Sequence, residues 1–207
     1  EDDWLYKTDI VKSIILNKLR MNTYRIFARK CEIKEIQNND LVRKFLDNNH
    51  IQGNVNSSIK IGLFYNDELV SLMTFGKLRL ALKSKSLGDQ YEMLRFCNKL
   101  NTTVIGAASR LFNYFIRNYD YDYIISYADR SYSNGKMYNM LGFDIDCITN
   151  SNYFYIINGI KHYRFNFRKD ILVKQGFDKN KSEHDIMLER GYYRLYNSGN
   201  YKFIYNK

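Results

Sequence analysis

The chain has 207 residues, enough for one domain with a substantial core. Its 45% hydrophobic and 26% charged residues are ordinary for a globular protein, and no apolar run approaches the ~18–20 residues of a membrane span, which excludes membrane, collagen-like and disordered classes. The 32 Lys and Arg against 22 Asp and Glu give a net charge of +10, which favours a polyanionic partner, most often nucleic acid.

Apolar residues that recur at helical spacing or alternate along the chain predict the secondary structure. The first half is expected to form a helix over 8–19, a strand over 24–36, a helix capped by Asn39-Asp40, a hairpin of strands 59–65 and 69–75, and a polar excursion over 76–90. The second half is expected to form strand 91–100, a helix after the small-residue turn 104–110, strand 122–128, a helix over 133–141 ended by Gly142, strands 143–148, 152–157 and 164–167, helices from Lys169 and Ser182, and a closing hairpin of 192–196 and 201–205. The alternation of strands and helices predicts an α/β layered fold, and the antiparallel hairpin makes its sheet mixed.

The number and spacing of the cysteines and histidines limit the redox and metal chemistry that we expect of the chain. Cys31, Cys97 and Cys147 are far apart and odd in number, and the three histidines show no metal-ligand spacing. We expect neither a disulfide framework nor a metal site. The acidic start Glu1-Asp2-Asp3 lacks the positive charge of a secretory signal, so we expect a cytoplasmic protein.

A small-residue turn leads from a strand into a helix at 104–110. Small side chains let the backbone approach a ligand, and the free N–H groups and dipole of the first helical turn favour an anion. The turn therefore predicts a cradle for a pyrophosphate or another anion. The alternative is that the small residues serve tight packing of the helix on the sheet.

This turn is followed by a strand ending Ser126-Tyr127-Ala128-Asp129 and by a short helix ending Leu141-Gly142-Phe143. The order resembles the GNAT family of acyl-CoA-dependent N-acetyltransferases. The resemblance implies a mixed, mainly antiparallel central sheet flanked by helices, and acetyl-CoA or another acyl-CoA as cofactor. It also implies that the pyrophosphate of CoA is held by Ile105, Gly106, Ala107, Ala108, Ser109 and Arg110, and that Tyr138 is the acid that protonates the leaving thiolate. Thr103 stands where the family usually has Gln or Arg, which leaves a vestigial cofactor groove as the alternative.

Two finer resemblances concern DNA. Short patterns across roughly 45–145, among them Glu92-Met93-Leu94-Arg95-Phe96, resemble a phage Mom-like branch of this family that modifies adenine in DNA. The first residues resemble the tail of the Vsr-like nuclease domain of phage homing endonucleases, which precedes a segment similar to 24–207. The resemblance implies an N-terminal helix over 1–22, a GNAT-like domain over 23–168 and a helix-plus-hairpin appendage over 169–207, without a complete nuclease.

Amine acylation needs a base for the amine proton and an acid for the thiolate. The candidate catalytic residues are Glu92, Asp129, Tyr138 and His50, because all four are expected near one cleft. Each has a structural alternative: a salt bridge for Glu92, a loop cap for Asp129, a core ring for Tyr138, and a helix C-terminal contact for His50.

Basic residues interleaved with apolar ones predict a nucleic-acid surface. The candidate DNA-binding residues are Lys77, Arg79, Lys83, Lys85, Arg95, Lys161, Arg164 and Arg168. The favoured interpretation is a GNAT-fold module that grips DNA in a phage homing-endonuclease-like protein. One alternative is a Mom-like acyltransferase acting on DNA bases, and another is an acetyltransferase of a small amine or a protein.

Overall fold

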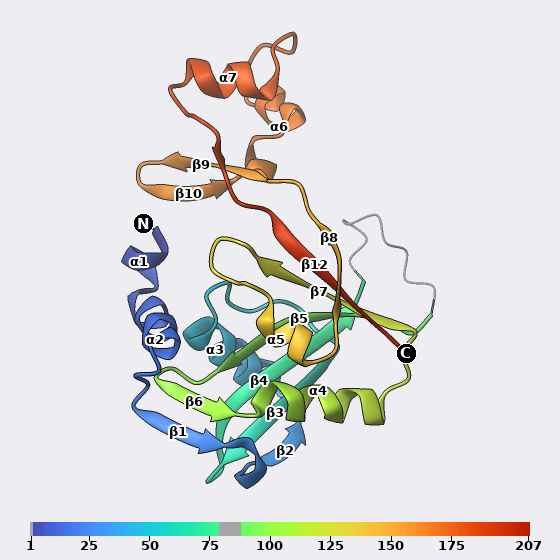
Figure 1. The fold of residues 1–207 in the computed structure, drawn as a ribbon. Coiled ribbons are helices and arrows are strands. Elements are labelled where there is room, and N and C mark those ends of the chain that lie inside the picture. Colours follow the sequence, from blue (N-terminus) through green and yellow to red (C-terminus); the bar gives the residue numbers. More distant parts are fainter. Residues whose placement is uncertain (1, 79–87) are drawn as a thin grey trace.

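The computed structural model describes residues 2–78 and 88–207, and its centre is one mixed β-sheet (Figure 1). Seven strands lie in the order β2-β3-β4-β5-β7-β12-β8. They are β2 (Glu32–Glu35), β3 (Ile59–Tyr65), β4 (Glu68–Lys77), β5 (Gln90–Asn98), β7 (Tyr123–Asp129), β12 (Asn200–Asn206) and β8 (Asp144–Ile148). Neighbours are antiparallel except β5 and β7, which run parallel. The expected α/β class, with a mixed and mainly antiparallel sheet flanked by helices, is confirmed.

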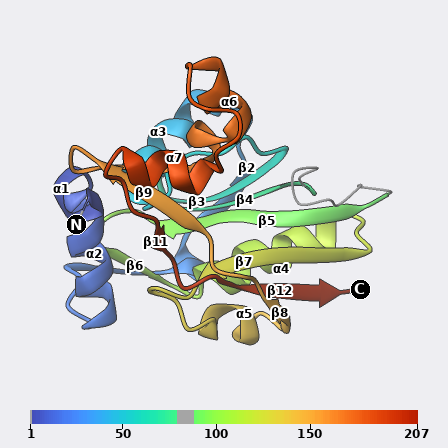
Figure 2. The same ribbon diagram turned by 90° about the horizontal axis from the view of Figure 1, so that it is seen from above.

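Helices cover both faces of this sheet (Figure 2). Helix α3 (Asn39–Asn49) packs on the face to which Leu72 of β4 points. Helix α4 (Ala107–Asn118) packs on the other face, where Phe115 stacks on Phe75 with ring centroids 3.8 Å apart. Strand residues alternate between faces, so β4 contributes to both apolar layers and is buried along most of its length.

Two of the described helices begin at a side-chain cap. Helix α3 is capped by Asn38, whose side-chain oxygen accepts the backbone N–H groups of Asp40 and Leu41 at 3.0 and 3.1 Å, one residue before the expected cap. The expected capping box at Ser182 is confirmed, with Asp185 as the reciprocal partner. No helix in the described part of the chain is long and apolar enough to cross a bilayer.

The predicted strand over 24–36 is wrong as a single element. The chain forms β1 (Tyr24–Phe27), a 3-10 turn η1 (Ala28–Lys30) and then β2, and only β2 joins the main sheet. Strand β1 instead pairs in parallel with β6 (Thr102–Ile105), the segment that leads into α4. The turn is needed because Ala28 and Cys31 are both buried in the core beneath α4. The chain before β1 forms α1 (Asp2–Tyr6) and α2 (Thr8–Lys18), and α2 lies beside β6 (Figure 1).

Residues 149–199, which we call the insert module, stand between β8 and β12 as a separate layer above the sheet (Figure 1). The module has its own sheet in the order β10-β9-β11. Its elements are β9 (Tyr153–Ile157), β10 (Ile160–Tyr163), the 3-10 turn η3 (Arg164–Phe167), α6 (Lys169–Lys174), α7 (Glu183–Glu189) and β11 (Leu195–Tyr196). Tyr155, Leu172, Ile186 and Met187 form its small buried core.

A charged cluster completes this core. The Glu183 carboxylate accepts hydrogen bonds from the hydroxyls of Tyr153, at 2.6 Å, and of Tyr155. The Arg194 guanidinium donates to the same carboxylate and lies over the Tyr153 ring, 4.3 Å from its centroid. Burial alone would raise the pKa of Glu183, but the hydrogen bonds from these three residues outweigh it and hold the pKa below its ordinary value. The cluster ties α7 to β9 and to the chain that enters β11.

The end of the chain differs from the expected appendage. The predicted hairpin of 192–196 with 201–205 does not form, because β11 pairs with β9 and β12 pairs with both β7 and β8. Residues 200–206 therefore belong to the main sheet, where Phe203 is fully buried. The predicted strand at 164–167 is also wrong, since these residues form η3 and the strand is the preceding β10. All seven residues of β12 pair with β7, whereas a hairpin with the two-residue β11 would pair far fewer of them, so β12 joins the main sheet.

Gly199 marks the return from the insert module into β12, and its replacement should weaken that junction. Its φ is +72°, and a Cβ there would stand 2.4 Å from the Thr149 carbonyl oxygen. We expect Gly199→Ala to lower the free energy of unfolding by about 3 kcal/mol, because a steric clash adds to the left-handed strain. Gly191→Ala is the matched control, since Gly191 has φ +77° and open space around it, and should cost about 1 kcal/mol. Equal losses in urea unfolding of the two variants would contradict the close approach at Gly199.

Candidate active site

The sheet opens between its two parallel strands. β5 and β7 pair only from Gln90 opposite Tyr123 to Glu92 opposite Ile125. Beyond that point β5 carries an extra residue, Leu94, against β4, and such a bulge bends the strand away from its other neighbour. The Ser126 hydroxyl donates to the Met93 carbonyl at 2.9 Å where the strands part. The result is a gap through the sheet with this hydrogen bond at its apex.

This gap holds two adjoining cavities, which we call together the strand-gap cleft. The smaller, of about 210 Å³, is the Tyr138 half, and the larger, of about 690 Å³, is the Glu92 half. Both halves are lined by Gln52, Met93, Leu94, Arg95 and Tyr127. The Tyr138 half also takes in His50, Asp129 and helix α5 (Lys136–Met140), and the Glu92 half takes in the ends of the insert module. Because they share five residues, the halves are two ends of one cleft.

Tyr138 packs in the core and faces the cleft. Its ring stacks on Phe203, with centroids 4.4 Å apart, and its hydroxyl lies 3.1 Å from Ser126 Oγ and 3.4 Å from the Tyr127 carbonyl oxygen. Burial raises the pKa of Tyr138, so the phenol keeps its proton at neutral pH. The residue is therefore a proton donor held in a fixed orientation at the apex of the cleft. Its ring packs in the core, as the structural alternative expected, and its hydroxyl is placed where a general acid could act.

Glu92 and Arg95 come from the same strand. Glu92 is 2% exposed and lines the larger half, on the side of the sheet facing the insert module. Arg95 lines both halves, and its guanidinium donates to the Gly53 carbonyl at 3.0 Å and to the Leu94 carbonyl at 2.8 Å. Arg95, a candidate DNA-binding residue, thus lies inside the cleft and gives it positive charge.

His50 lies at the wall of the Tyr138 half as a neutral side chain. Burial, together with the positive charges of Arg95 and Lys7, lowers its pKa to about 4. Its Nδ1 accepts the backbone N–H of Gln52 at 3.1 Å, so the ring proton resides on Nε2. His50 can therefore donate a hydrogen bond into the cleft but cannot take up a proton at neutral pH. This geometry favours a positioning role over the base role considered from sequence.

Loops at the mouth of the Tyr138 half are held from two sides. Asp129 caps its own loop by accepting the Ser131 N–H at 2.8 Å, in agreement with the structural alternative for this residue. The ammonium of Lys18 donates to the Tyr132 carbonyl at 2.8 Å, and that of Lys7 donates to the Ile51 carbonyl. The N-terminal helices thus bridge the two loops that flank this half.

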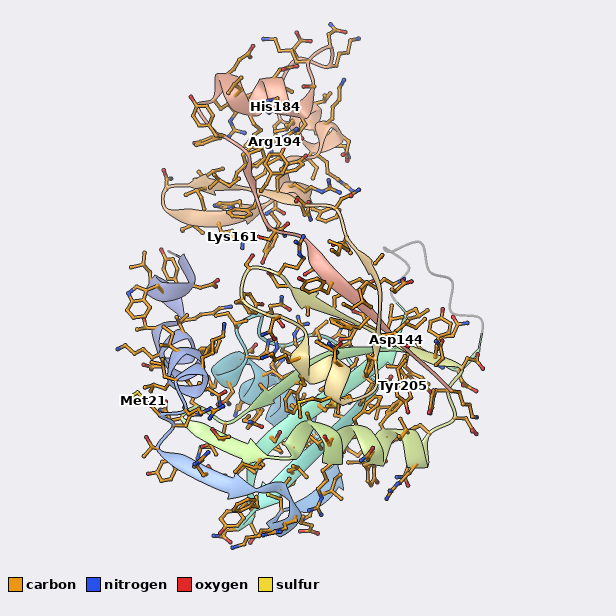
Figure 3. The ribbon with its side chains drawn as sticks, viewed as in Figure 1. Met21, Asp144, Lys161, His184, Arg194 and Tyr205 are labelled. Atoms are coloured by element: carbon orange, nitrogen blue, oxygen red, sulfur yellow. The ribbon has the colours of Figure 1, made fainter. Side chains whose placement is uncertain are left out.

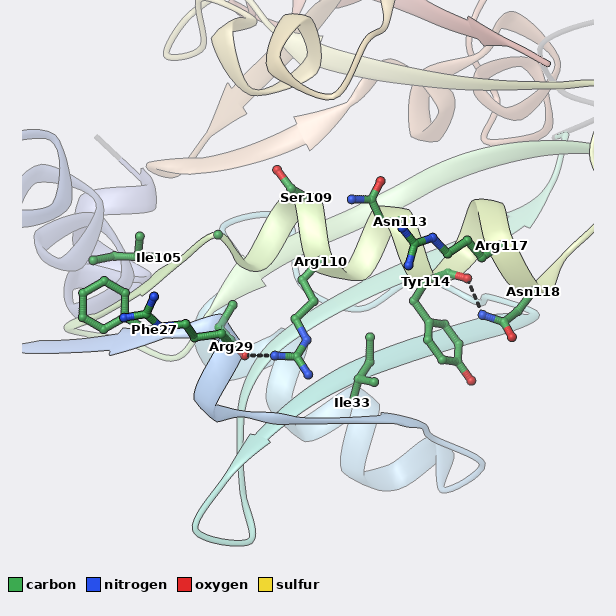
Figure 4. Close-up of a pocket in the computed structure, with 12 residues that line it drawn as sticks. Phe27, Arg29, Ile33, Ile105, Ser109, Arg110, Asn113, Tyr114, Arg117 and Asn118 are labelled. Atoms are coloured by element: carbon green, nitrogen blue, oxygen red, sulfur yellow. Dashed lines mark hydrogen bonds between the residues drawn. The ribbon is translucent and has the colours of Figure 1, made fainter.

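Four residues of the predicted cradle line a separate groove beside α4, with a volume of about 600 Å³ (Figure 4). Gly106 is the N-cap of α4 with φ +81°, and a Cβ there would meet only Ala28, at 3.8 Å. Ile105, Ser109 and Arg110 also line the groove, and the Arg110 guanidinium donates to the Ala28 carbonyl. Of the other two residues, Ala107 is buried against the core and Ala108 packs on it.

The candidate residues thus divide between two places. Glu92, Asp129, Tyr138 and His50 line the strand-gap cleft, whereas four of the six cradle residues line the groove beside α4. Sequence reasoning did not single out Arg29 and Arg117 of that groove. It also gave no role to Ser126 at the apex, although a hydroxyl after Ile124-Ile125 in a buried strand was a usable signal.

The candidate DNA-binding residues have different surroundings. Lys77 lies over the Tyr91 ring, 4.4 Å from its centroid, and Arg79, Lys83 and Lys85 lie outside the described residues. Lys161 lies 4.3 Å above the Phe154 ring, and Arg164 reaches the Glu92 half. Arg168 pairs with Asp170 at 3.3 Å. Among the residues that the structure describes, no group of three or more His, Cys, Asp or Glu side chains is arranged to hold a metal ion.

Comparison with known proteins extends to structure alone. No family model and no curated protein matches the chain. A Bacillus subtilis acetyltransferase solved in complex with CoA superposes with a TM-score of 0.50 at 13% identity, covering 86% of this chain and 99% of that one. A GNAT-family acetyltransferase from Bacillus cereus (TM-score 0.45, 12% identity, coverage 86% and 97%) and an aminoglycoside 6'-acetyltransferase type Ii (0.45, 13%, 84% and 96%) are also similar. At these identities the likeness to the first structure shows the fold: this chain has the GNAT acetyltransferase fold.

The neutral state of His50 predicts a pH dependence of stability. In the unfolded chain His50 binds a proton below its ordinary pKa of 6.5, whereas in the folded protein it stays neutral until the pH falls to about 4. Stability therefore falls as the pH drops through this window, by as much as about 3 kcal/mol from this residue. His50→Asn, whose side-chain oxygen can still accept the Gln52 N–H, should flatten this part of the curve in urea unfolding between pH 7 and 4. Identical slopes for the two proteins would contradict the lowered pKa, because they would show that His50 takes up its proton at the same pH in the folded and the unfolded protein.

Proposed function

We propose that the protein is an acyl-CoA-dependent N-acyltransferase whose reaction takes place in the strand-gap cleft. The observation that carries the proposal is the through-sheet cleft with a buried carboxylate, Glu92, at one half and a protonated phenol, Tyr138, at the other. The fold supports it, as does the CoA bound to the Bacillus subtilis acetyltransferase. Donor and acceptor would enter the two halves and meet at Leu94 and Arg95.

The cleft has features that fit an extended acyl donor. Past Glu92 and Ile125, β5 and β7 no longer pair with each other, and each presents a strand edge to the gap. Such an edge offers backbone N–H and C=O groups to an amide-bearing ligand that runs alongside it. The first turn of α4 would hold the phosphates, with Ile105, Gly106, Ala107, Ala108, Ser109 and Arg110 as the proposed residues. The open approach at Gly106 supports that assignment.

The protein's own residues would perform the proton transfers. When bound, an acyl-CoA supplies a thioester whose acyl carbon accepts an amine and whose sulfur leaves. Glu92 would accept the amine proton in the larger half, where the carboxylate is shielded from water. Tyr138 would donate its Oη proton to the leaving sulfur. Arg95, fixed by the Gly53 and Leu94 carbonyls, would place a positive charge next to the oxygen on which negative charge develops.

The second candidate is the function favoured from sequence, a GNAT-fold module that grips DNA in a phage homing-endonuclease-like protein. The net charge of +10 and the cations lying over aromatic rings at Lys161 and Arg164 support DNA binding. This function needs no working cofactor site, so it gives no purpose to the cleft that holds Glu92 and Tyr138. The two functions also combine: the finer proposal is a Mom-like enzyme whose acceptor amine belongs to a DNA base.

Tyr138→Phe tests the transferase. The variant keeps the ring that stacks on Phe203 and loses only the hydroxyl. We expect the rate of acetyl transfer to an amine acceptor to fall about 100-fold, the scale of general acid catalysis, while calorimetry shows unchanged acetyl-CoA affinity. Tyr24→Phe, at an exposed position of β1, is the control and should match the unaltered protein.

The same titration separates the two candidates. Acetyl-CoA binding by the unaltered protein supports the transferase. Salt-sensitive binding of a DNA duplex without any acetyl-CoA binding would reject the transferase and leave the DNA-gripping module.

A further inference from the structure

The insert module forms one wall of the Glu92 half. The segment 149–152, which leads from β8 into β9, lines it, as do Arg164 of η3 and Asn200 at the start of β12. The opposite wall is the β5 segment from Glu92 to Arg95. Whatever reaches Glu92 from this side therefore passes between the insert module and the main sheet. The module is in a position to select the acceptor.

One face of the module's sheet has no helix on it. Alternation and register put Phe154, Ile156, Lys161, Tyr163 and Leu195 on the same face, which we call the platform face. Tyr155, between two of them, points the other way into the module core under α6 and α7. Tyr163 is 63% exposed, Leu195 46% and Ile156 37%, so the face is open and apolar. Figure 3 shows Lys161 on the side of the hairpin that faces the main domain.

The chemistry of the platform face fits flat rings joined by anionic groups. Lys161 Nζ lies 4.3 Å from the centroid of the half-buried Phe154 ring and 5.8 Å from that of the exposed Tyr163 ring, so a cation stands between two aromatic rings. Open sheet faces with aromatic rings and cations bind unpaired bases by stacking and pair with the phosphates between them. A duplex keeps the faces of its bases stacked inside the helix, so they cannot stack on such rings. The net charge of +10 complements a polyanion.

The platform face ends next to the cleft. Tyr163 ends β10, and the chain then turns into η3, so the next residue, Arg164, lies on the opposite face of the module's sheet, over the Tyr153 ring at 5.5 Å, and lines the Glu92 half. A strand that passes from Tyr163 around the end of β10 thus meets a guanidinium that can pair with a phosphate at the entrance of the cleft. The volume of about 690 Å³ is in the range of sites that enclose a nucleotide-sized ligand.

We propose that the insert module binds single-stranded nucleic acid on the platform face and delivers the exocyclic amine of an unpaired base to the Glu92 half. The proposal rests on the acyltransferase function for its second part. In that step a bond forms between the base nitrogen and the acyl carbon, and the carbon–sulfur bond of the thioester breaks. The amine proton goes to Glu92, and the leaving sulfur takes the proton of Tyr138.

Binding of a dye-labelled single-stranded oligonucleotide, followed by fluorescence anisotropy without any acyl donor, tests the platform. Tyr163→Ala should weaken binding about tenfold, the scale of one lost base stack. Lys161→Gln should weaken it severalfold and reduce its salt dependence. Tyr24→Ala, exposed on β1, and Lys179→Gln, exposed between α6 and α7, are the matched controls and should leave the affinity unchanged. Equal affinity of Tyr163→Ala and the unaltered protein, or tighter binding of the duplex of the same sequence, would overturn the platform.

Delivery to the cleft needs a second measurement. Transfer of a labelled acetyl group from acetyl-CoA to the same oligonucleotide is expected for the unaltered protein and should fall at least tenfold in Arg164→Gln, with acetyl-CoA affinity retained. A protein that binds the single strand but not acetyl-CoA would refute the transferase and keep the platform. A protein that binds acetyl-CoA and acetylates a free amine, but does not acetylate the oligonucleotide, would refute delivery and keep the transferase.

Discussion

The structure depends on the divergence of two parallel strands in a sheet that is otherwise continuous. One extra residue, Leu94, in β5 is enough to end the pairing with β7 after Glu92. Separating the strands in the middle of a sheet leaves backbone groups unpaired, and the fold limits this cost locally. The Ser126 hydroxyl satisfies the Met93 carbonyl, and the Arg95 guanidinium satisfies the Leu94 carbonyl. The gap therefore stays open with its polar groups already oriented.

Strand β12 makes this opening stable. It adds to β7 on the side away from β5, pairs along seven residues, and then carries β8 as the next strand. Phe203 at its centre is fully buried and supports the Tyr138 ring. The phenol that reaches the apex of the cleft thus depends on a residue 65 positions later in the chain. Gly135 allows this stack, because a Cβ there would stand 2.5 Å from the Phe203 ring.

Local sequence signals predicted which helices and strands form better than they predicted which strands pair with each other. The hairpin of β3 and β4, helix α4, and the capping box at Ser182 depend on neighbouring residues and were predictable. The separation of β1 from β2 was not, because both segments alternate and only tertiary burial of Ala28 and Cys31 requires a turn between them. The pairing of the final strands was predicted wrongly for the same reason. Asn197-Ser198-Gly199-Asn200 is a typical hairpin sequence, but β12 pairs along seven residues with β7 in the main sheet, more than β11 could offer. Likewise, residue types suggested Glu92, Asp129, Tyr138 and His50, but only the geometry distinguishes a loop cap and a neutral imidazole from a proton acceptor.

The place of the insert module in the chain makes it one wall of the cleft. A module joined at a terminus would have one connection and could move freely against the sheet. This one has two, through β8 and β12, and these are adjacent strands of the same sheet. Both connections pass the Glu92 half, through Thr149 on one side and Asn200 on the other, and the Asn200 N–H donates to the Thr149 hydroxyl at 2.9 Å. Closing the module's base in this way holds Arg164 and Glu92 in the lining of one cavity, so the strands that complete the sheet also shape the entrance to the Glu92 half.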